Sequence, residues 1–179
     1  MVLFEEEMFT TGAVEVRRDA DARVLCIGLG AGYMDITVVE LDPVMVQIAR
    51  KWFGLKEDHR HRVIVEDGLK YMEEATEHGV TFDVIYLDAC TTQKHVDLTS
   101  NCPVGSFLTE DAAMMLSKMT RTRGVLVVNV LSLTLIPDVI SNEVWEVKSI
   151  YEKFFAECII TSVSDLLNTN SCELEMHQN

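Results

Sequence analysis

The sequence predicts an α/β protein whose sheet has about seven strands, is mainly parallel and ends in an antiparallel hairpin. Short runs rich in β-branched residues alternate with segments of helical periodicity, which is the pattern of parallel strands joined by helices. The last two strand runs are separated only by Ser164 to Thr169, too few residues for a crossover helix. The chain has 179 residues, of which 48% are hydrophobic. This length fits one domain over residues 1–179, with an N-terminal extension over 1–22 and a core over 23–176.

Each element has its own sequence pattern. The expected strands are runs enriched in β-branched residues, and the expected helices are segments of helical periodicity. The strands are Arg23 to Ile27, Ile36 to Glu40, Arg62 to Val65, Phe82 to Asp88, Gly124 to Leu131, Cys158 to Val163 and Ser171 to Met176. The helices are Pro43 to Phe53, Leu69 to His78, Leu108 to Thr120 and Asp138 to Phe155.

Capping residues support two of these helices. Asp42 before Pro43 is typical of an N-cap followed by proline at the first helical position. Thr109 precedes two acids, which favour the positive end of a helix. The bases and glycine of Arg121 to Gly124 are expected to close the same helix.

The first strand runs into a glycine loop, VLCIGLGAG, which places Gly28, Gly30 and Gly32 in the spacing GxGxG. Glycines after a first strand let backbone N–H groups approach a cofactor. The dinucleotide pattern GxGxxG would need a small residue where this chain has Tyr33, which disfavours a nicotinamide cofactor. By itself, a glycine triplet can also be a tight turn without a ligand.

Acidic residues follow three further strands. Glu40 can accept both ribose hydroxyls of an adenosine-type cofactor, whereas Asp42 is better explained as a helix cap. Asp67, followed by Gly68, could accept the amino group of an adenine or could cap the next helix, and the sequence leaves both open. Asp88 closes a central strand, so we expect it to face the substrate as the catalytic residue.

The connection between the first two strands is unusually short. Parallel neighbours need a crossover of roughly a dozen residues, yet only Tyr33 and Met34 separate Gly32 from Asp35. The first crossover helix is therefore missing from the chain, or it belongs to a segment omitted from the numbered sequence. We expect a break in the chain between Gly32 and Asp35.

Composition limits the choice of partner. There are 29 acidic and 15 basic residues, a formal net charge of −14, which disfavours nucleic acid and anionic membranes and suits a basic partner or a solvated surface. The five cysteines lack CxxC spacing, and we interpret them as reduced thiols in a cytoplasmic protein. His59 and His61 flank Arg60 without acid or cysteine at ligand spacing, so no metal site is expected.

The motifs together resemble the spermidine-synthase-like methyltransferases, within the branch that methylates lysine and N-terminal amines of a protein. The resemblance covers about residues 23–176, and ARKWFGL is its most specific part. Cys26 stands where ordinary methyltransferases carry an acid. The motifs that carry the resemblance are VLCIGLGAG, VVELDP, VMVQIARKWFGL, VEDGLKYM, FDVIYLDA and GVLVVNVLS.

The resemblance implies a Rossmann-like methyltransferase sheet and S-adenosylmethionine as cofactor, held by Gly28, Gly30, Gly32, Glu40, Asp67 and Gly68. It places Asp88 beside the reactive methyl, implies a protein substrate and allows a homodimer. Two alternatives stay open. One is aminopropyl transfer to a polyamine, although DACTTQ (Asp88 to Gln93) replaces the usual DSSDP-type loop. The other is a Rossmann-like binding module without catalysis, which the short crossover favours.

Overall fold

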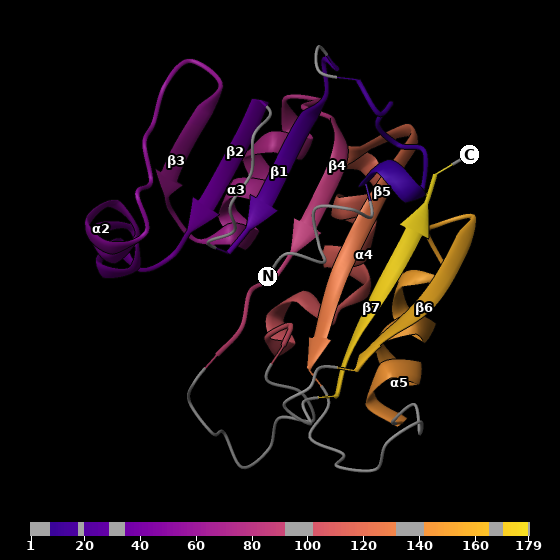
Figure 1. Cartoon of the computed structure of the whole chain (residues 1–179). Helices are drawn as coiled ribbons and strands as arrows, with labels where there is room; N and C mark the ends of the chain where they lie inside the picture. The colour runs from indigo at the N-terminus through magenta and orange to yellow at the C-terminus, as the bar shows by residue number, and fades with distance from the viewer. Residues whose placement is uncertain are drawn as a thin grey trace.

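The computed structural model of the chain describes residues 8–17, 20–28, 35–91, 102–131, 142–164 and 170–178. Its centre is a seven-stranded sheet in the order β3-β2-β1-β4-β5-β7-β6 (Figure 1). The first five strands pair in parallel, and β7 runs antiparallel to both β5 and β6. The predicted fold class is therefore confirmed. The strands are β1 (Arg23–Ile27), β2 (Asp35–Glu40), β3 (His61–Val65), β4 (Phe82–Leu87), β5 (Thr120–Leu131), β6 (Glu157–Ser164) and β7 (Asn170–His177).

The helices begin where the capping residues predict. Asp42 accepts a hydrogen bond from the backbone N–H of Val44, and Thr109 accepts one from Ala112. The last helix begins at Asn142, and the residues expected to open it, 138–141, lie outside the described residues. Among the described residues, none of the helices combines the length and the apolar composition of a membrane-spanning segment. The helical elements are α2 (Pro43–Trp52), α3 (Gly68–Glu77), the short 3₁₀ helix η1 (Gly105–Phe107), α4 (Glu110–Met119) and α5 (Asn142–Tyr151).

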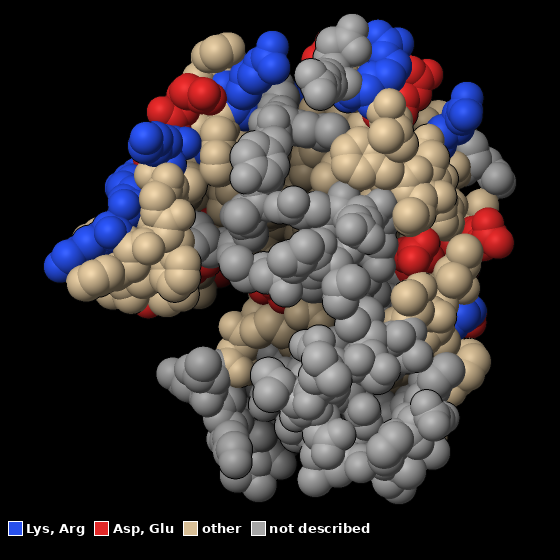
Figure 2. Space-filling model, viewed as in Figure 1, with Lys and Arg blue, Asp and Glu red and all other residues tan. Residues whose placement is uncertain are grey.

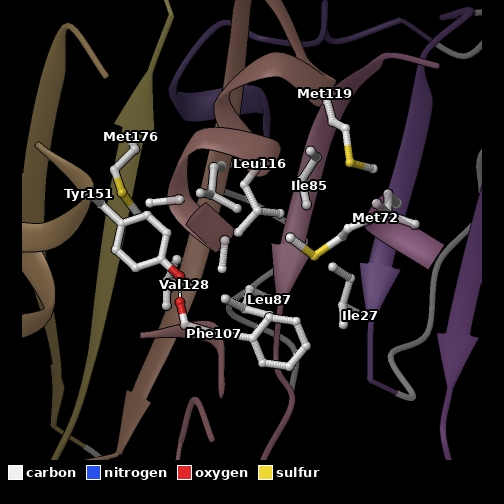
Figure 3. Packing of buried hydrophobic residues seen from close by; sticks show 14 of the residues in the cluster. Ile27, Met72, Ile85, Leu87, Phe107, Leu116, Met119, Val128, Tyr151 and Met176 are labelled. Carbon is white, nitrogen blue, oxygen red and sulfur yellow. Dashed lines mark hydrogen bonds between the residues drawn. The ribbon is translucent and has the colours of Figure 1, made fainter. Parts of the chain in front are cut away.

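The larger hydrophobic core lies between the sheet and the layer formed by α3, α4 and α5 (Figures 1 and 3). Ile85 and Leu87 of β4 are fully buried there against Met72 of α3 and Leu116 of α4. Figure 3 shows these side chains meeting between the helices and the strands. This packing fixes the direction of β4, and hence the position of the residues that follow it.

The other face of the sheet has a smaller core. Alternate residues of β1, β2, β4 and β5 are buried there, and Met8 and Val14 from the N-terminal residues 8–14 pack against them. Helix α2 lies at the β3 edge, where Val46 and Ala49 are its buried residues (Figure 1). Among the described residues, the helices α3, α4 and α5 therefore cover one face of the sheet, and the other face has the smaller core.

The prediction that Arg121 to Gly124 closes α4 is wrong. The helix ends at Met119, and these residues already belong to β5. The Arg121 guanidinium donates to both carboxylate oxygens of Asp83 on β4, at 2.9 and 2.7 Å. This tertiary ion pair draws the segment into the sheet, and the register shift between Phe82 and Val84 accommodates it.

Strands β1 and β2 are parallel neighbours, with Arg23 opposite Asp35 and Ile27 opposite Val39. The chain must therefore return from Ile27 to Asp35, roughly 14 Å across a strand of this length. The expected break between Gly32 and Asp35 falls on residues 29–34, which lie outside the described residues.

Candidate functional site

The carboxyl ends of β1, β2, β3 and β4 lie at one edge of the sheet (Figure 1). Parallel pairing therefore gathers the residues that end or follow these strands, among them Gly28, Glu40, Asp67 and Asp88. Gly30 and Gly32 lie outside the described residues. These four residues, which the sequence assigns to a site, end or follow four different strands and therefore lie along one edge of the sheet.

Gly28, the first residue of the glycine loop, follows β1 and contacts the residue that follows β4. Its backbone has φ 103°, and a Cβ added there would collide with the carbonyl oxygen of Asp88. The Gly28 N–H donates to the carbonyl of Val39 at 2.9 Å, and the Asp88 N–H donates to the carbonyl of Ile27 at 2.9 Å. Only glycine fits this position, because it combines a left-handed backbone with close contact between two chain segments.

Glu40 ends β2 with a locally fixed carboxylate. Its Oε1 accepts a hydrogen bond from the backbone N–H of Asp42 at 2.8 Å. Asp42 uses its own carboxylate to cap α2, as the sequence predicts. The two acids therefore have different local roles, and Glu40 is the one whose side chain is not committed to a helix end.

Asp67 caps α3: its Oδ1 accepts from the N–H groups of Leu69 at 2.8 Å and Lys70 at 3.4 Å. Both bonds use Oδ1, which leaves Oδ2 as the oxygen that could meet a ligand. The cap is thus one of the two roles that the sequence left open. At Gly68, an added Cβ would lie 2.9 Å from the Ile27 side chain and 3.0 Å from the Phe107 ring, so glycine lets α3 start close to β1.

Asp88 is paired with a residue that the sequence reasoning missed. Asn129 Nδ2, from β5, donates to Asp88 Oδ1 at 2.7 Å. Burial raises the pKa of the half-buried Asp88 carboxyl, and the hydrogen bond from Asn129 lowers that pKa. The Oδ1 of Asn129 is buried without a hydrogen-bond partner in the described part of the chain. Asn129 lies inside the apolar run VLVVNVL, and a polar side chain in such a run indicates a buried hydrogen-bond partner.

The expectation that the cysteines are all reduced is wrong for two of them. Cys90 and Cys102 form a disulfide with their Cα atoms 4.4 Å apart. The Val104 N–H donates to the carbonyl of Ala89 at 2.8 Å, which brings the two segments together beside Asp88. Their separation of 12 positions gave no sign of this contact. Cys26 and Cys158 are not in a disulfide, and the Cys172 side chain lies outside the described residues.

One group of possible metal ligands gathers among the described residues, formed by Asp88, Cys90 and Cys102. The two sulfur atoms are bonded to each other and are therefore not available as thiolates. His59 and His61 are not part of this group.

The strand order, the glycine turn after β1 and the acids at the ends of the next strands define a Rossmann-like methyltransferase fold. Human methyltransferase-like protein 13, solved in complex with SAH, has the same fold, with a TM-score of 0.79. It is 20% identical and is aligned over 98% of this chain and 82% of its own. The spermine/spermidine synthase domain matches residues 32–176, and the chain belongs to that family.

Two curated relatives carry different names. The eEF1A lysine and N-terminal methyltransferase homolog of Drosophila pseudoobscura pseudoobscura is 31% identical over 124 residues. That alignment covers 63% of this chain and 18% of the relative. The polyamine aminopropyltransferase of Vibrio vulnificus (strain CMCP6) is 30% identical over 146 residues, 74% of this chain and 44% of that protein. The chain thus spans less than half the length of either relative.

Proposed function

We propose that this chain is the catalytic core of an S-adenosylmethionine-dependent methyltransferase that acts on a protein amine. The observation that carries the proposal is the Asp88–Asn129 pair, held against Gly28 at the carboxyl edge of the sheet. A half-buried carboxylate with one fixed donor is suited to accept and orient an N–H group. The curated relatives named as methyltransferases support the same reaction.

The described residues fit an adenosine-type cofactor. Gly28 packs against the Asp88 carbonyl, so the glycine loop begins beside the residue proposed to face the reactive methyl. Glu40 supplies a carboxylate for ribose hydroxyls, and Asp67 keeps Oδ2 for the base. Gly68 lets the N-terminus of α3 come close to β1. Gly30 and Gly32 join this set through the family resemblance.

The mechanism asks for positioning more than for acid–base chemistry. S-adenosylmethionine supplies an electrophilic methyl group on a sulfonium. Asp88, when ionised, accepts an N–H of the neutral amine and directs the nitrogen lone pair. Asn129 holds Asp88 Oδ1 in place through its side-chain amide. The proton released by the methylated amine passes to Asp88 or to solvent.

A protein acceptor is supported by the names of the relatives and by charge. A net charge of −14 favours association with a basic partner. The acidic excess is not uniform, because Lys and Arg gather on the rim over β3 and α2 (Figure 2). We therefore place the basic partner away from this rim, whose cations are Arg50, Lys51, Lys56, Arg60 and Arg62.

The test is transfer of labelled methyl groups from S-adenosylmethionine to proteins of a cell extract, with Asp88→Asn as the matched control. We expect labelled protein with the unchanged chain and a loss of label on the order of a hundredfold or more with the variant. If the chain binds S-adenosylmethionine but labels no protein, peptide or amine, it is a binding module and the proposed activity is wrong.

A second candidate, aminopropyl transfer, is favoured by the identity to the Vibrio vulnificus aminopropyltransferase. It would use the same edge of the sheet with a decarboxylated form of the cofactor and a small diamine. Incubation with putrescine and decarboxylated S-adenosylmethionine distinguishes the two reactions. Consumption of putrescine without protein methylation would assign the chain to this second activity.

A further inference from the structure

Cys90 and Cys102 lie next to the proposed acceptor carboxylate and differ in exposure. Cys90 is exposed, whereas Cys102 is 1% exposed. Their Cα separation of 4.4 Å falls within the range that a disulfide needs. The backbone hydrogen bond between Val104 and Ala89 holds the same two segments together independently of the sulfur atoms. Reduced thiols would therefore stay close enough to close the bond again.

The oxidation state of the pair changes what Asp88 contacts. Cys90 Sγ lies 3.4 Å and Cys102 Sγ 3.8 Å from Asp88 Oδ1. A thiol S–H can donate a hydrogen bond to a carboxylate, whereas a disulfide sulfur has no hydrogen to donate. Asn129 Nδ2 donates to the same oxygen at 2.7 Å and also lies 3.7 Å from Cys102 Sγ, and its amide donor does not depend on the oxidation state of the sulfur atoms. Oxidation therefore removes up to two donors from Asp88 and leaves the amide donor in place.

We propose that Cys90 and Cys102 are a site of reversible oxidation, and that their oxidation state changes the hydrogen bonds donated to the Asp88 carboxylate. In the dithiol form the two thiols support the ionised Asp88, and in the disulfide form that support is withdrawn. The effect on methyl transfer rests on the proposed function, whereas the oxidation itself does not.

The oxidant is a low-molecular-weight disulfide of the glutathione type. The exposed Cys90 thiolate attacks one of its sulfur atoms, forms a mixed disulfide and expels one thiolate. The buried Cys102 thiolate then attacks the Cys90 sulfur and expels the second. Two electrons pass from the cysteines to the small disulfide, and the two cysteine protons end on the two released thiols. A small dithiol reverses both steps.

The direction of the effect follows from the donors. Cys90 and Cys102 add weak donors to a carboxylate that is also bonded by Asn129, and donors to a carboxylate favour its ionised form. Reduction should therefore lower the pKa of Asp88, and oxidation should raise it. At a pH on the acid side of the rate profile, we expect kcat/KM of the reduced form to be roughly three- to tenfold higher, the range that one net hydrogen bond supports.

The experiment equilibrates the protein in glutathione buffers of increasing oxidised fraction and traps free thiols for mass spectrometry. Methyl transfer is measured on the same samples. We expect one disulfide between Cys90 and Cys102, and an activity that falls along the same curve as the thiols disappear. Cys158→Ser, which removes a free thiol distant in sequence from the site, should keep this response.

Two variants at one position separate hydrogen bonding from tethering. Cys90→Ser cannot form the disulfide but keeps an O–H donor, whereas Cys90→Ala has no donor. Both should lose the response to oxidised glutathione, and Cys90→Ser should be several-fold more active than Cys90→Ala. Equal activity of the two variants would overturn the role of the donors.

The effect of oxidation on Asp88 can also be measured without catalysis, even if the chain transfers no methyl group. The pKa of Asp88 can be followed by NMR of the labelled carboxyl carbon, assigned with Asp88→Asn, in each oxidation state. A lower pKa in the reduced form supports the inference. An unchanged pKa, or thiols that stay free under oxidising buffers, would overturn it, while failure of methyl transfer alone would contradict only the proposed function.

Discussion

The side-chain amide of Asn129 donates a hydrogen bond of 2.7 Å to the carboxylate of Asp88, joining the carboxyl-terminal part of β5 to the residue that follows β4. Burial raises the pKa of Asp88, and this bond acts in the opposite direction. The hydrogen bond also fixes the orientation of the half-buried carboxylate. The proposed chemistry depends on the balance between burial, which raises the pKa of Asp88, and the hydrogen bond, which lowers it.

Replacing Asn129 with leucine should impair methyl transfer without removing the cofactor site. The variant keeps the volume but loses the donor, so the pKa of Asp88 rises further and its ionised form needs a higher pH. We expect kcat/KM to fall on the order of tenfold or more and the acid limb of the pH–rate profile to move to higher pH. A fall in rate with an unmoved acid limb would show that Asn129 acts by packing alone.

Asp88→Asn should abolish activity yet stabilise the fold at neutral pH. Burial raises the folded-state pKa of Asp88 above its unfolded value, so ionising it costs stability above about pH 3.9, the ordinary Asp pKa. The neutral amide avoids this cost. Urea unfolding should give a higher free energy of unfolding than the unchanged chain at pH 7, with the difference disappearing below pH about 4. A variant that is less stable at pH 7 would contradict this.

Gly28→Ala should disturb both the fold and the site. The added methyl meets the Asp88 carbonyl at a backbone with φ 103°, and we expect a loss of roughly 3 kcal/mol or more. Gly79→Ala is the matched control, because Gly79 also has a positive φ, 64°, but has open space around it. Its cost should be about 1 kcal/mol. Equal losses in denaturant unfolding would mean that contact with Asp88 is unimportant.

Glu40→Gln should weaken S-adenosylmethionine binding by roughly tenfold or more, because a charged acceptor of hydroxyl hydrogen bonds is lost. The exposed Glu77, at the far end of α3, provides the control substitution Glu77→Gln. Calorimetric titration of both variants measures the change. If Glu77→Gln weakens binding as much, the effect is one of total charge and not of a ribose contact.

Sequence predicted best what depends on neighbours along the chain. Asp42 and Asp67 cap helices whose N–H groups lie two or three residues away, so local pattern was sufficient for Asp42 and named one role of Asp67. Strand β1 is an apolar run ended by glycine, and its bounds are as predicted. The start of β5 was misplaced because Arg121 is held by Asp83, 38 positions away. Asn129 and the Cys90–Cys102 disulfide also depend on contacts that only the folded sheet creates.

Calorimetric titration of the unchanged chain with S-adenosylmethionine is the decisive measurement, because the proposed methyl transfer begins with binding of that cofactor. We predict saturable binding at one site per chain, weakened by Glu40→Gln and retained by Glu77→Gln. Absence of binding heat at millimolar cofactor, with the chain folded, would contradict it.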